Sequence, residues 1–365
     1  MIIMPFQLRE YIKPDFNEQK FKDAPDTSIA LVTKDGVAPE NFHAMSIFPE
    51  YFKIGGKWLL AEESRMDCVP VLKNGKIEVV EFRLLRRGDA VICGRTENCE
   101  DGIFLHADGF ADDDTTKDSF LFRSNRSRET AFSRDYDELY ELLRHDRENG
   151  KIVWVLGPAF AFDKDAREAF SKIISAGYAD AVLAGNALAT HDLEGAYLHT
   201  ALGQNIYTQK NVPNGHYNHL DTINAVRECG SIESFLKEKQ LSDGIIASCL
   251  EHKVPFVLAG SIRDDGPLPP VLGNAYEAQD AMRNELRDAT TVICMATMLH
   301  TIAVGNMTPS YRVLPDGTIR EVYFYCVDIS EFMLRKLSDR GSLAAKSIVT
   351  NVQDFIVNVA KGLGL

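Results

Sequence analysis

The feature that most restricts the fold is a repeated change from short apolar runs to helical segments after residue 151. The runs KIVWVLG, ADAVLAG, VPFVLAG and TVICMAT are apolar without alternation, and helical segments such as DAREAFSKIISAGY and YEAQDAMRNELRDA lie between them. Strands that are apolar on both sides are typical of a parallel sheet covered by helices on both faces. Because crossovers are right-handed, the carboxyl ends of all these strands should meet at one edge.

Residues 1–110 contain shorter runs separated by Gly, Asn and Asp. In CVPVLKNGKIEVVEF, two strand-like runs flank an Asn-Gly pair, which favours a type I′ turn and predicts a β-hairpin. We therefore expect a small β-rich domain over 1–110. Residues 111–150 begin with the acidic stretch ADDDTTKDS and are predicted to form a linker and a helix. The predicted fold class is α/β, with a Rossmann-like parallel sheet over 151–365 that the small β-rich domain precedes.

Composition restricts the class of protein. A chain of 365 residues exceeds the size of a single core, about 250–300 residues, so two or three domains are expected. The net charge of -13, with no basic stripe, argues against nucleic acid. No apolar run reaches about 18 residues, which argues against a membrane span, and the N-terminus lacks a secretion signal. The seven scattered cysteines are typical of thiols in a reducing cytosol. A cytoplasmic protein is expected.

Polar residues follow the carboxyl ends of the predicted strands, where open α/β sheets bind ligands. Any one of them has a structural explanation, since Asn186 or Asp328 could cap a helix. Together they favour a nucleotide or dinucleotide site. The groups in question are Asn186-Ala187, Arg263-Asp264-Asp265, Thr297-Met298-Leu299-His300, Asp328 and Asn351-Val352.

A Gly-x-Gly-x-x-Gly fingerprint is missing. GPAFAF and GNALAT contain one glycine each. If a dinucleotide binds, its phosphates should therefore meet helix N-termini and single-glycine turns. Asp328 has the right chemistry to accept hydrogen bonds from ribose hydroxyls.

A second polar cluster lies in HDLEGAYLHT and NGHYNHLDTIN, which we expect to be loop-like. Its spacing fits no usual zinc pattern, and no metal is expected. Histidines beside carboxylates favour substrate recognition or proton transfer. Cys249 lies on the apolar face of a predicted helix and is interpreted as a core residue rather than a nucleophile. The cluster comprises His191, Asp192, Glu194, His199, His216, His219 and Asp221.

Several segments resemble one known family. GYADAVLAGNALATHDLE, VPFVLAGSIRDDGPLP, ATMLHTIAVGNMTPS and CVDIS closely resemble the archaeal-type ornithine cyclodeaminase family over about 150–355. The same region resembles the C-terminal part of cyanobacterial bifunctional arginine-degrading enzymes and the conserved region of lysine-ketoglutarate reductase/saccharopine dehydrogenase proteins. A weaker resemblance covers about 38–95, in the β-rich domain.

The resemblance implies NAD bound by a modified Rossmann-like domain, and a homo-oligomer. The family has an additional N-terminal segment, which this chain is expected to lack. Asn351 stands where the family has aspartate, and its Gly-Gly-His-x-His-His run is NGHYNH (214–219) here. The cofactor contacts implied by motif are Asn186, Ala187, Asp265, Thr297, Met298, Leu299, His300, Asp328, Asn351 and Val352.

The implied activity is that of an NAD-dependent ammonia-lyase, which converts L-ornithine to L-proline and ammonia by hydride abstraction, cyclisation and re-reduction. Arg263 is the candidate for the substrate carboxylate, because a guanidinium pairs with it in bidentate fashion. Asp264 or Glu194 could hold the δ-ammonium, and His191, His216 or His219 could carry protons. Two alternatives stay open: a cyclodeaminase or dehydrogenase for another amino acid, and a non-catalytic subunit that binds NAD.

Overall fold

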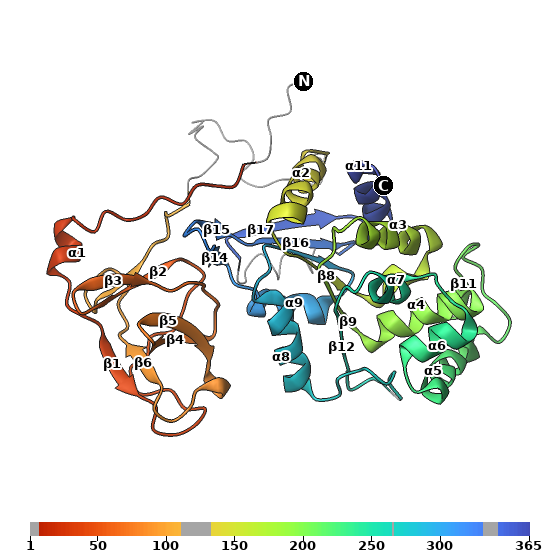
Figure 1. The fold of residues 1–365 in the computed structure, drawn as a ribbon, viewed down its shortest axis with the longest axis horizontal. Coiled ribbons are helices and arrows are strands. Elements are labelled where there is room, and N and C mark those ends of the chain that lie inside the picture. The colour runs from red at the N-terminus through yellow and green to blue at the C-terminus, as the bar shows by residue number, and fades with distance from the viewer. Residues whose placement is uncertain (1–6, 111–132, 265, 331–341) are drawn as a thin grey trace.

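The computed structural model describes residues 7–110, 133–264, 266–330 and 342–365. Figure 1 shows a β-rich part, coloured red to orange, beside a larger part in which helices surround a sheet. The predicted linker after residue 110 lies largely outside the described residues. Most of the segment 330–340 also lies outside them.

The larger part is built on a parallel sheet of six strands. In spatial order, the strands are β12 (Phe256–Ala259), β9 (Ala181–Gly185), β8 (Ile152–Leu156), β13 (Thr291–Met295), β16 (Tyr323–Asp328) and β17 (Ala344–Val349). Every neighbouring pair is parallel. Numbered along the chain, this order is 3-2-1-4-5-6, which is the doubly wound arrangement. The predicted Rossmann-like sheet is confirmed.

Helices cover both faces of this sheet, as predicted. Along β8, Trp154 and Leu156 pack into one apolar cluster, while Val153 and Val155 pack into another. The first cluster includes residues of α2 (Ser133–Asn149), α3 (Lys164–Ser175), α7 (Ile245–Glu251) and α11 (Val352–Leu363). The second includes residues of α8 (Ala275–Leu286) and α9 (Met298–Met307). Cys249 is fully buried in the first cluster, and burial raises the pKa of its thiol to about 12, so its interpretation as a core residue is confirmed.

The connection from β9 to β12 is long. It contains α4 (Asn186–Leu198), β10 (Thr200–Ala201), β11 (Gln204–Asn205), η3 (Gly215–Tyr217), α5 (Asn218–Cys229), α6 (Ile232–Lys239) and α7. The expectation that HDLEGAYLHT and NGHYNHLDTIN are loop-like is wrong. Most of the first segment belongs to the buried helix α4, and most of the second to η3 and α5. The acidic side chains of α4 tolerate burial because they are paired. Asp192, for example, accepts hydrogen bonds from Arg167 Nε at 2.8 Å and from Ile246 N at 2.9 Å.

The β-rich part consists of two antiparallel sheets. One has the order β1 (Ser28–Leu31), β6 (Ala90–Cys93), β4 (Cys68–Lys73), β5 (Lys76–Glu81), and the other β3 (Lys57–Leu60), β2 (Glu50–Ile54), β7 (Ile103–Leu105). Between β4 and β5, Asn74 and Gly75 have φ angles of 53° and 78°. Two left-handed residues at this position define the predicted type I′ turn.

The two parts meet through a hairpin and a set of ion pairs. The hairpin of β14 (Tyr311–Val313) and β15 (Ile319–Glu321) lies between α9 and β16 in the chain. From it, the buried Tyr311 hydroxyl donates to Ala61 O at 2.5 Å. From α8, Arg283 Nε lies 2.5 Å from a Glu81 carboxylate oxygen. No helix in the described part of the chain is long and apolar enough to cross a membrane.

A buried ion pair joins helix α2 to this hairpin. Asp146 and Arg320 are both almost fully buried, with N–O distances of 3.0 and 3.1 Å. The hydroxyls of Thr290 and Thr291 also donate to Asp146. Burial alone would raise the pKa of Asp146, but the charge and hydrogen bonds of Arg320 outweigh it and hold the pKa below its usual value.

We expect Asp146→Asn to reduce the free energy of unfolding by about 3–5 kcal/mol near neutral pH, because it leaves the Arg320 charge buried and unpaired. Since the folded-state pKa is depressed, the carboxylate stabilises the fold above its unfolded pKa of about 3.9 and loses this effect as pH falls through the folded value. The difference from wild type should therefore shrink below about pH 4. Urea unfolding at several pH values measures it, with the exposed Glu148→Gln on the same helix as control. An equal deficit at pH 3 and pH 7 would contradict the account.

Candidate functional site

The carboxyl edge of the six-stranded sheet is the candidate site. All six strands end at this edge because they are parallel, and the strand order reverses between β8 and β13. Ligands of doubly wound sheets bind outside such a reversal. The residues that the sequence singled out follow five of these six strands, so the topology brings them to one side of the domain.

At the reversal, the loops after β8 and β13 touch through their backbones. Gly157 N donates to Met295 O at 2.8 Å, and a Cβ atom on Gly157 would lie 1.8 Å from Ala296 O. Ala296 itself has a φ angle of 53°, which is unusual for a residue with a side chain. The single glycine of GPAFAF is therefore needed for contact with the neighbouring strand. Phosphate groups would have to meet the other strand ends and helix N-termini of this edge.

The ends of β9, β12 and β13 converge around His300. A Cβ atom on Gly185, the last residue of β9, would lie 3.0 Å from His300 Cε1, so the imidazole of α9 rests against the end of β9. Burial lowers the pKa of His300, and the charge of Asp264, which follows β12, opposes that shift. Three of the predicted site groups are thus near one another.

Asn186 connects β9 to the segment after β12. Asn186 is buried and is the first residue of α4. The N-cap residue of this helix is Gly185, so the interpretation of Asn186 as a helix cap is wrong. The side-chain oxygen of Asn186 accepts a hydrogen bond from Leu268 N at 3.0 Å. Ala187 beside it is half-buried. Asn186 therefore anchors the loop that follows the predicted polar residues of β12.

In that loop, Asp264 Oδ2 accepts a hydrogen bond from Ser261 N at 2.7 Å, which forms a tight turn. Arg263 is exposed, and its side chain has no ion-pair partner among the described residues. Its guanidinium is therefore available to a ligand. Asp265 lies outside the described residues.

The remaining candidates begin helices or end strands. Thr297 is the N-cap residue of α9, and Met298 and Leu299 after it are 45% and 68% exposed. At the end of β16, Asp328 Oδ1 accepts a hydrogen bond from Ser330 N at 2.8 Å. Ile329 beside it is 74% exposed. Apolar side chains exposed at a ligand-binding edge suit contact with flat aromatic rings.

Asn351 has a definite local role. Its side-chain oxygen accepts hydrogen bonds from Gln353 N at 2.7 Å and Asp354 N at 3.3 Å, so it caps α11. Val352 after it is buried. An asparagine does this as well as an aspartate would, so the change from the family's aspartate leaves the helix N-terminus in place at the edge.

Beside this edge, α4 and α5 bring together part of the second cluster. His191 Nδ1 lies 2.9 Å from Glu194 Oε2, and both side chains are buried. Glu194 also accepts hydrogen bonds from Thr200, Leu202 and Gly203. Glu194 therefore holds the β10–β11 hairpin and orients His191.

Two buried polar atoms near His191 lack hydrogen-bond partners in the described structure. The ring of His219 on α5 lies 6.1 Å from that of His191, between ring centres, and its Nδ1 is buried with no hydrogen-bond partner in the described structure. Thr190 Oγ1, next to His191 in the chain, is also buried without a hydrogen-bond partner there. Buried polar atoms without partners are uncommon and point to a ligand or water. His216 is separate from this pair: it is exposed, and its ring lies against Tyr217.

Sequence reasoning missed two parts of this site. Phe162, from η2 (Pro158–Phe162) after β8, packs its ring edge-to-face on His191 with centres 5.4 Å apart, and so brings the histidines next to the sheet edge. The contact between Gly157 and Ala296 was also unforeseen, since it joins loops far apart in sequence. No group of three or more metal-ligating side chains occurs among the residues that the structure describes.

Comparison with known proteins identifies the class of protein to which this chain belongs. Residues 138–359 match the family described as arginine dihydrolase ArgZ-like, C-terminal, Rossmann fold. The ornithine cyclodeaminase of Methanocaldococcus jannaschii is 37% identical over 334 residues, which cover 88% of this chain and 74% of that protein.

Solved structures agree. A conserved LOR/SDH protein of Methanococcus maripaludis S2 superposes with a TM-score of 0.83 at 33% identity, covering 93% of this chain and 98% of that one. The ternary complex of AgrE with ornithine and NAD+ superposes with a TM-score of 0.57 at 32% identity, covering 94% of this chain and 46% of that one. AgrE is the name of a bifunctional arginine dihydrolase/ornithine cyclodeaminase of Nostoc sp.. The chain belongs to the archaeal-type ornithine cyclodeaminase family, as its motifs predicted.

Gly157→Ala should disturb the edge, because the added methyl group meets the Ala296 backbone and the loops after β8 and β13 must separate. Such overpacking costs about 1–3 kcal/mol or more. We expect a lower midpoint of thermal unfolding together with weaker binding of NAD+ in a calorimetric titration. Gly273→Ala is the matched control, since a Cβ atom there meets nothing within 4 Å. Equal behaviour of the two variants would contradict the described contact.

Proposed function

We propose that the protein is an NAD-dependent ornithine cyclodeaminase that converts L-ornithine to L-proline and ammonia. The observation that carries this proposal is the convergence of three strand ends around His300, with Gly185 on one side and the charge of Asp264 near it. In a member of this family, that convergence provides a polar wall at the edge where a doubly wound sheet binds a dinucleotide.

The residues at the edge fit NAD. The N-termini of α4, α9 and α11 supply backbone N–H groups for phosphate oxygens. Met298 and Leu299 expose apolar surface for a flat ring, and Asp328 presents a carboxylate suited to ribose hydroxyls. The residues proposed to hold the cofactor are Asn186, Ala187, Asp265, Thr297, Met298, Leu299, His300, Asp328, Asn351 and Val352. When bound, NAD+ supplies reversible hydride transfer, so the overall reaction needs no external oxidant.

The loop after β12 is proposed to bind the ends of the substrate. Arg263 is exposed and unpaired in the described structure, and a guanidinium binds a carboxylate through two parallel hydrogen bonds. For the δ-ammonium group, Asp264 is a better candidate than Glu194. Glu194 is fully buried, and its oxygens already accept from several donors. These contacts would orient the substrate carbon toward the edge.

His219 is proposed to carry protons for the amine groups. Its Nδ1 is buried without a hydrogen-bond partner in the described structure, and an imidazole is the side chain best suited to exchange protons near neutral pH. His191 is then a positioning residue, since Glu194 fixes its ring and His191 lies beside His219. His216 is exposed on η3, so it is the weakest candidate of the three histidines.

Incubation of the purified protein with L-ornithine and NAD+ tests the function. We expect proline and ammonia in equal amounts, with no net accumulation of NADH, because the hydride is returned to the product. Chromatography of the amino acids, an ammonia assay and absorbance at the NADH band measure this. Steady accumulation of NADH would indicate a dehydrogenase instead. Turnover of another diamino acid but not ornithine would reject the substrate.

Substitutions of His216 and His219, which are three residues apart, distinguish the roles of these two histidines. His219→Ala should lower kcat by about 10²–10⁴-fold, the usual loss of a general acid–base group. It should also change the shape of the pH–rate profile, because the group proposed to carry protons is lost. His216→Ala should leave both close to wild type. Loss of activity in the His216 variant and not in the His219 variant would reverse the assignment.

A further inference from the structure

A chain of side-chain hydrogen bonds joins the two helices that carry His191 and His219. Asn218 Nδ2 donates to Thr200 Oγ1 at 2.8 Å, and Thr200 Oγ1 donates to Glu194 Oε1 at 2.7 Å. Glu194 Oε2 in turn lies 2.9 Å from His191 Nδ1 on α4. On α5, Asn218 directly precedes His219. The chain therefore begins beside one histidine and ends on the other.

Thr200 is the middle member of this chain. It belongs to β10, and its side chain is almost fully buried. A hydroxyl has one proton to donate, and Thr200 donates it to Glu194, which leaves the oxygen to accept from Asn218. Because the hydroxyl is buried, water competes little with either hydrogen bond.

Glu194 holds the α4 end of the chain in one orientation. Besides Thr200, Leu202 N donates to it at 3.1 Å and Gly203 N at 3.3 Å. An ionised carboxylate has about four lone-pair sites, and the contact with His191 fills the last of them. The carboxylate can therefore not turn without losing hydrogen bonds, and it fixes the imidazole of His191.

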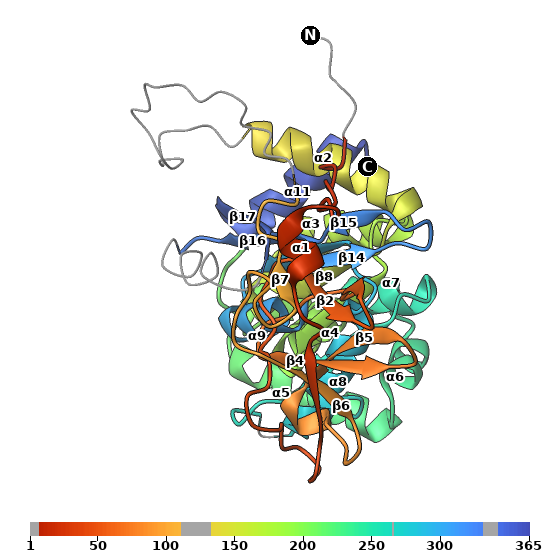
Figure 2. The same cartoon turned by 90° about the vertical axis from the view of Figure 1, so that its left-hand side faces the viewer.

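Two glycines bring the β10–β11 hairpin close to α5. A Cβ atom on Gly203 would lie 2.9 Å from Gly215 C, and one on Gly215 would lie 2.6 Å from Gly203 O. The turn of the hairpin therefore touches the backbone of η3, which leads directly into α5. This close approach places Thr200 within reach of Asn218. The hairpin and α5 lie away from the β-rich part, at the right of Figure 1 and behind that part in Figure 2.

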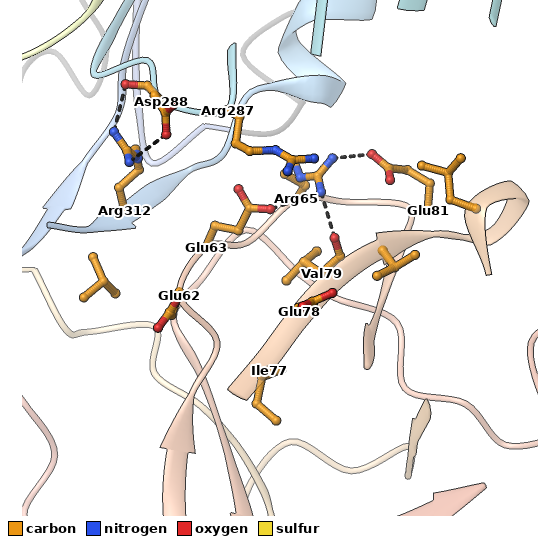
Figure 3. A pocket seen from close by; sticks show the side chains of 13 residues that line it. Glu62, Glu63, Arg65, Ile77, Glu78, Val79, Glu81, Arg287, Asp288 and Arg312 are labelled. Atoms are coloured by element: carbon orange, nitrogen blue, oxygen red, sulfur yellow. Dashed lines mark hydrogen bonds and ion pairs between the residues drawn. The ribbon is translucent and has the colours of Figure 1, made fainter. Parts of the chain in front are cut away.

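Unpaired polar atoms beside the chain point to a ligand. In the pocket between the β-rich and α/β parts, Arg312 pairs with Asp288 at 3.1 Å (Figure 3), and such a pair needs no ligand. Beside the hydrogen-bonded chain, in contrast, Thr190 Oγ1 and His219 Nδ1 are buried without partners in the described structure. Buried atoms of this kind suit a substrate or water. The chain thus lies against the place where protons would be transferred.

We propose that Thr200 and Asn218 are positioning residues for proton transfer, because their hydrogen bond holds the ring of His219 at a fixed separation from that of His191. The ring centres are 6.1 Å apart. This proposal rests on the proposed function, in which His219 carries protons. Without the link, α5 and its histidine can shift relative to α4. A misplacement of about 1 Å costs up to about 100-fold in rate.

Substitutions of Thr200 test the hydroxyl. Thr200→Val removes it and keeps the branched shape, and we expect kcat for L-ornithine to fall about 10–100-fold with little change in KM. The shape of the pH–rate profile should also change. Thr200→Ser keeps the hydroxyl and should restore most of the rate. Thr308→Val is the matched control, because its buried hydroxyl donates to Val304 O at 2.7 Å, at the end of α9.

Asn218→Ala tests the connection to α5. It leaves the hydrogen bond between Thr200 and Glu194 in place, so a similar loss of kcat identifies the link between the helices as the cause. Since both changes break the same link, the double variant should lose no more than Thr200→Val alone. Additive losses would overturn the proposal. So would a rise in KM alone, a loss in Thr200→Val no larger than in Thr308→Val, or no rescue by Thr200→Ser.

Nuclear magnetic resonance measures the ring positions without relying on turnover. In deuterated protein with protonated histidine rings, cross-relaxation between His191 and His219 should occur in wild type and Thr200→Ser and be weaker in Thr200→Val. Its absence from wild type, or equal strength in Thr200→Val, would overturn the link. Wild-type protein that shows the expected signals but does not convert ornithine contradicts the proposed function instead, so the two failures are distinguishable.

Discussion

The parallel hydrogen bonding of six strands is the constraint on which the rest of the structure depends. It forces every strand to end at the same edge, and it therefore gathers residues between Gly157 and Asn351 that are far apart in the sequence. The close backbone contact between Gly157 and Ala296 then replaces the glycine-rich loop common in doubly wound folds. What remains at the edge are helix N-termini, a carboxylate, an imidazole and exposed apolar side chains. This set of groups suits a dinucleotide.

Carboxylates serve two different purposes here. Asp146, Asp192 and Glu194 each accept several hydrogen bonds, and they hold helices and hairpins around the sheet. Asp264 and Asp328 stand at strand ends, and among the described residues each accepts only a short-range backbone hydrogen bond. The second kind is free to respond to a ligand. This distinction explains why Glu194, which looks catalytic beside His191 in the sequence, is better interpreted as a support.

The sequence predicted the sheet well because unbroken apolar runs such as VWVL and VICM reflect burial on both faces. It failed for α4, because His191, Asp192 and Glu194 make the segment look polar although Arg167 and backbone groups pair with them. Local patterns carry no record of such long-range partners. For the same reason, the Gly157–Ala296 contact could not be foreseen, since its residues meet only through the tertiary fold.

A crystal structure of the protein with NAD+ and L-ornithine tests the central claim most directly. The account predicts a dinucleotide stretched along the carboxyl edge, in contact with Asn186, His300 and Asp328, and an ornithine between Arg263 and His219. A dinucleotide bound at any other surface would contradict it. So would clear density for these loops with no ligand among them at saturating concentrations.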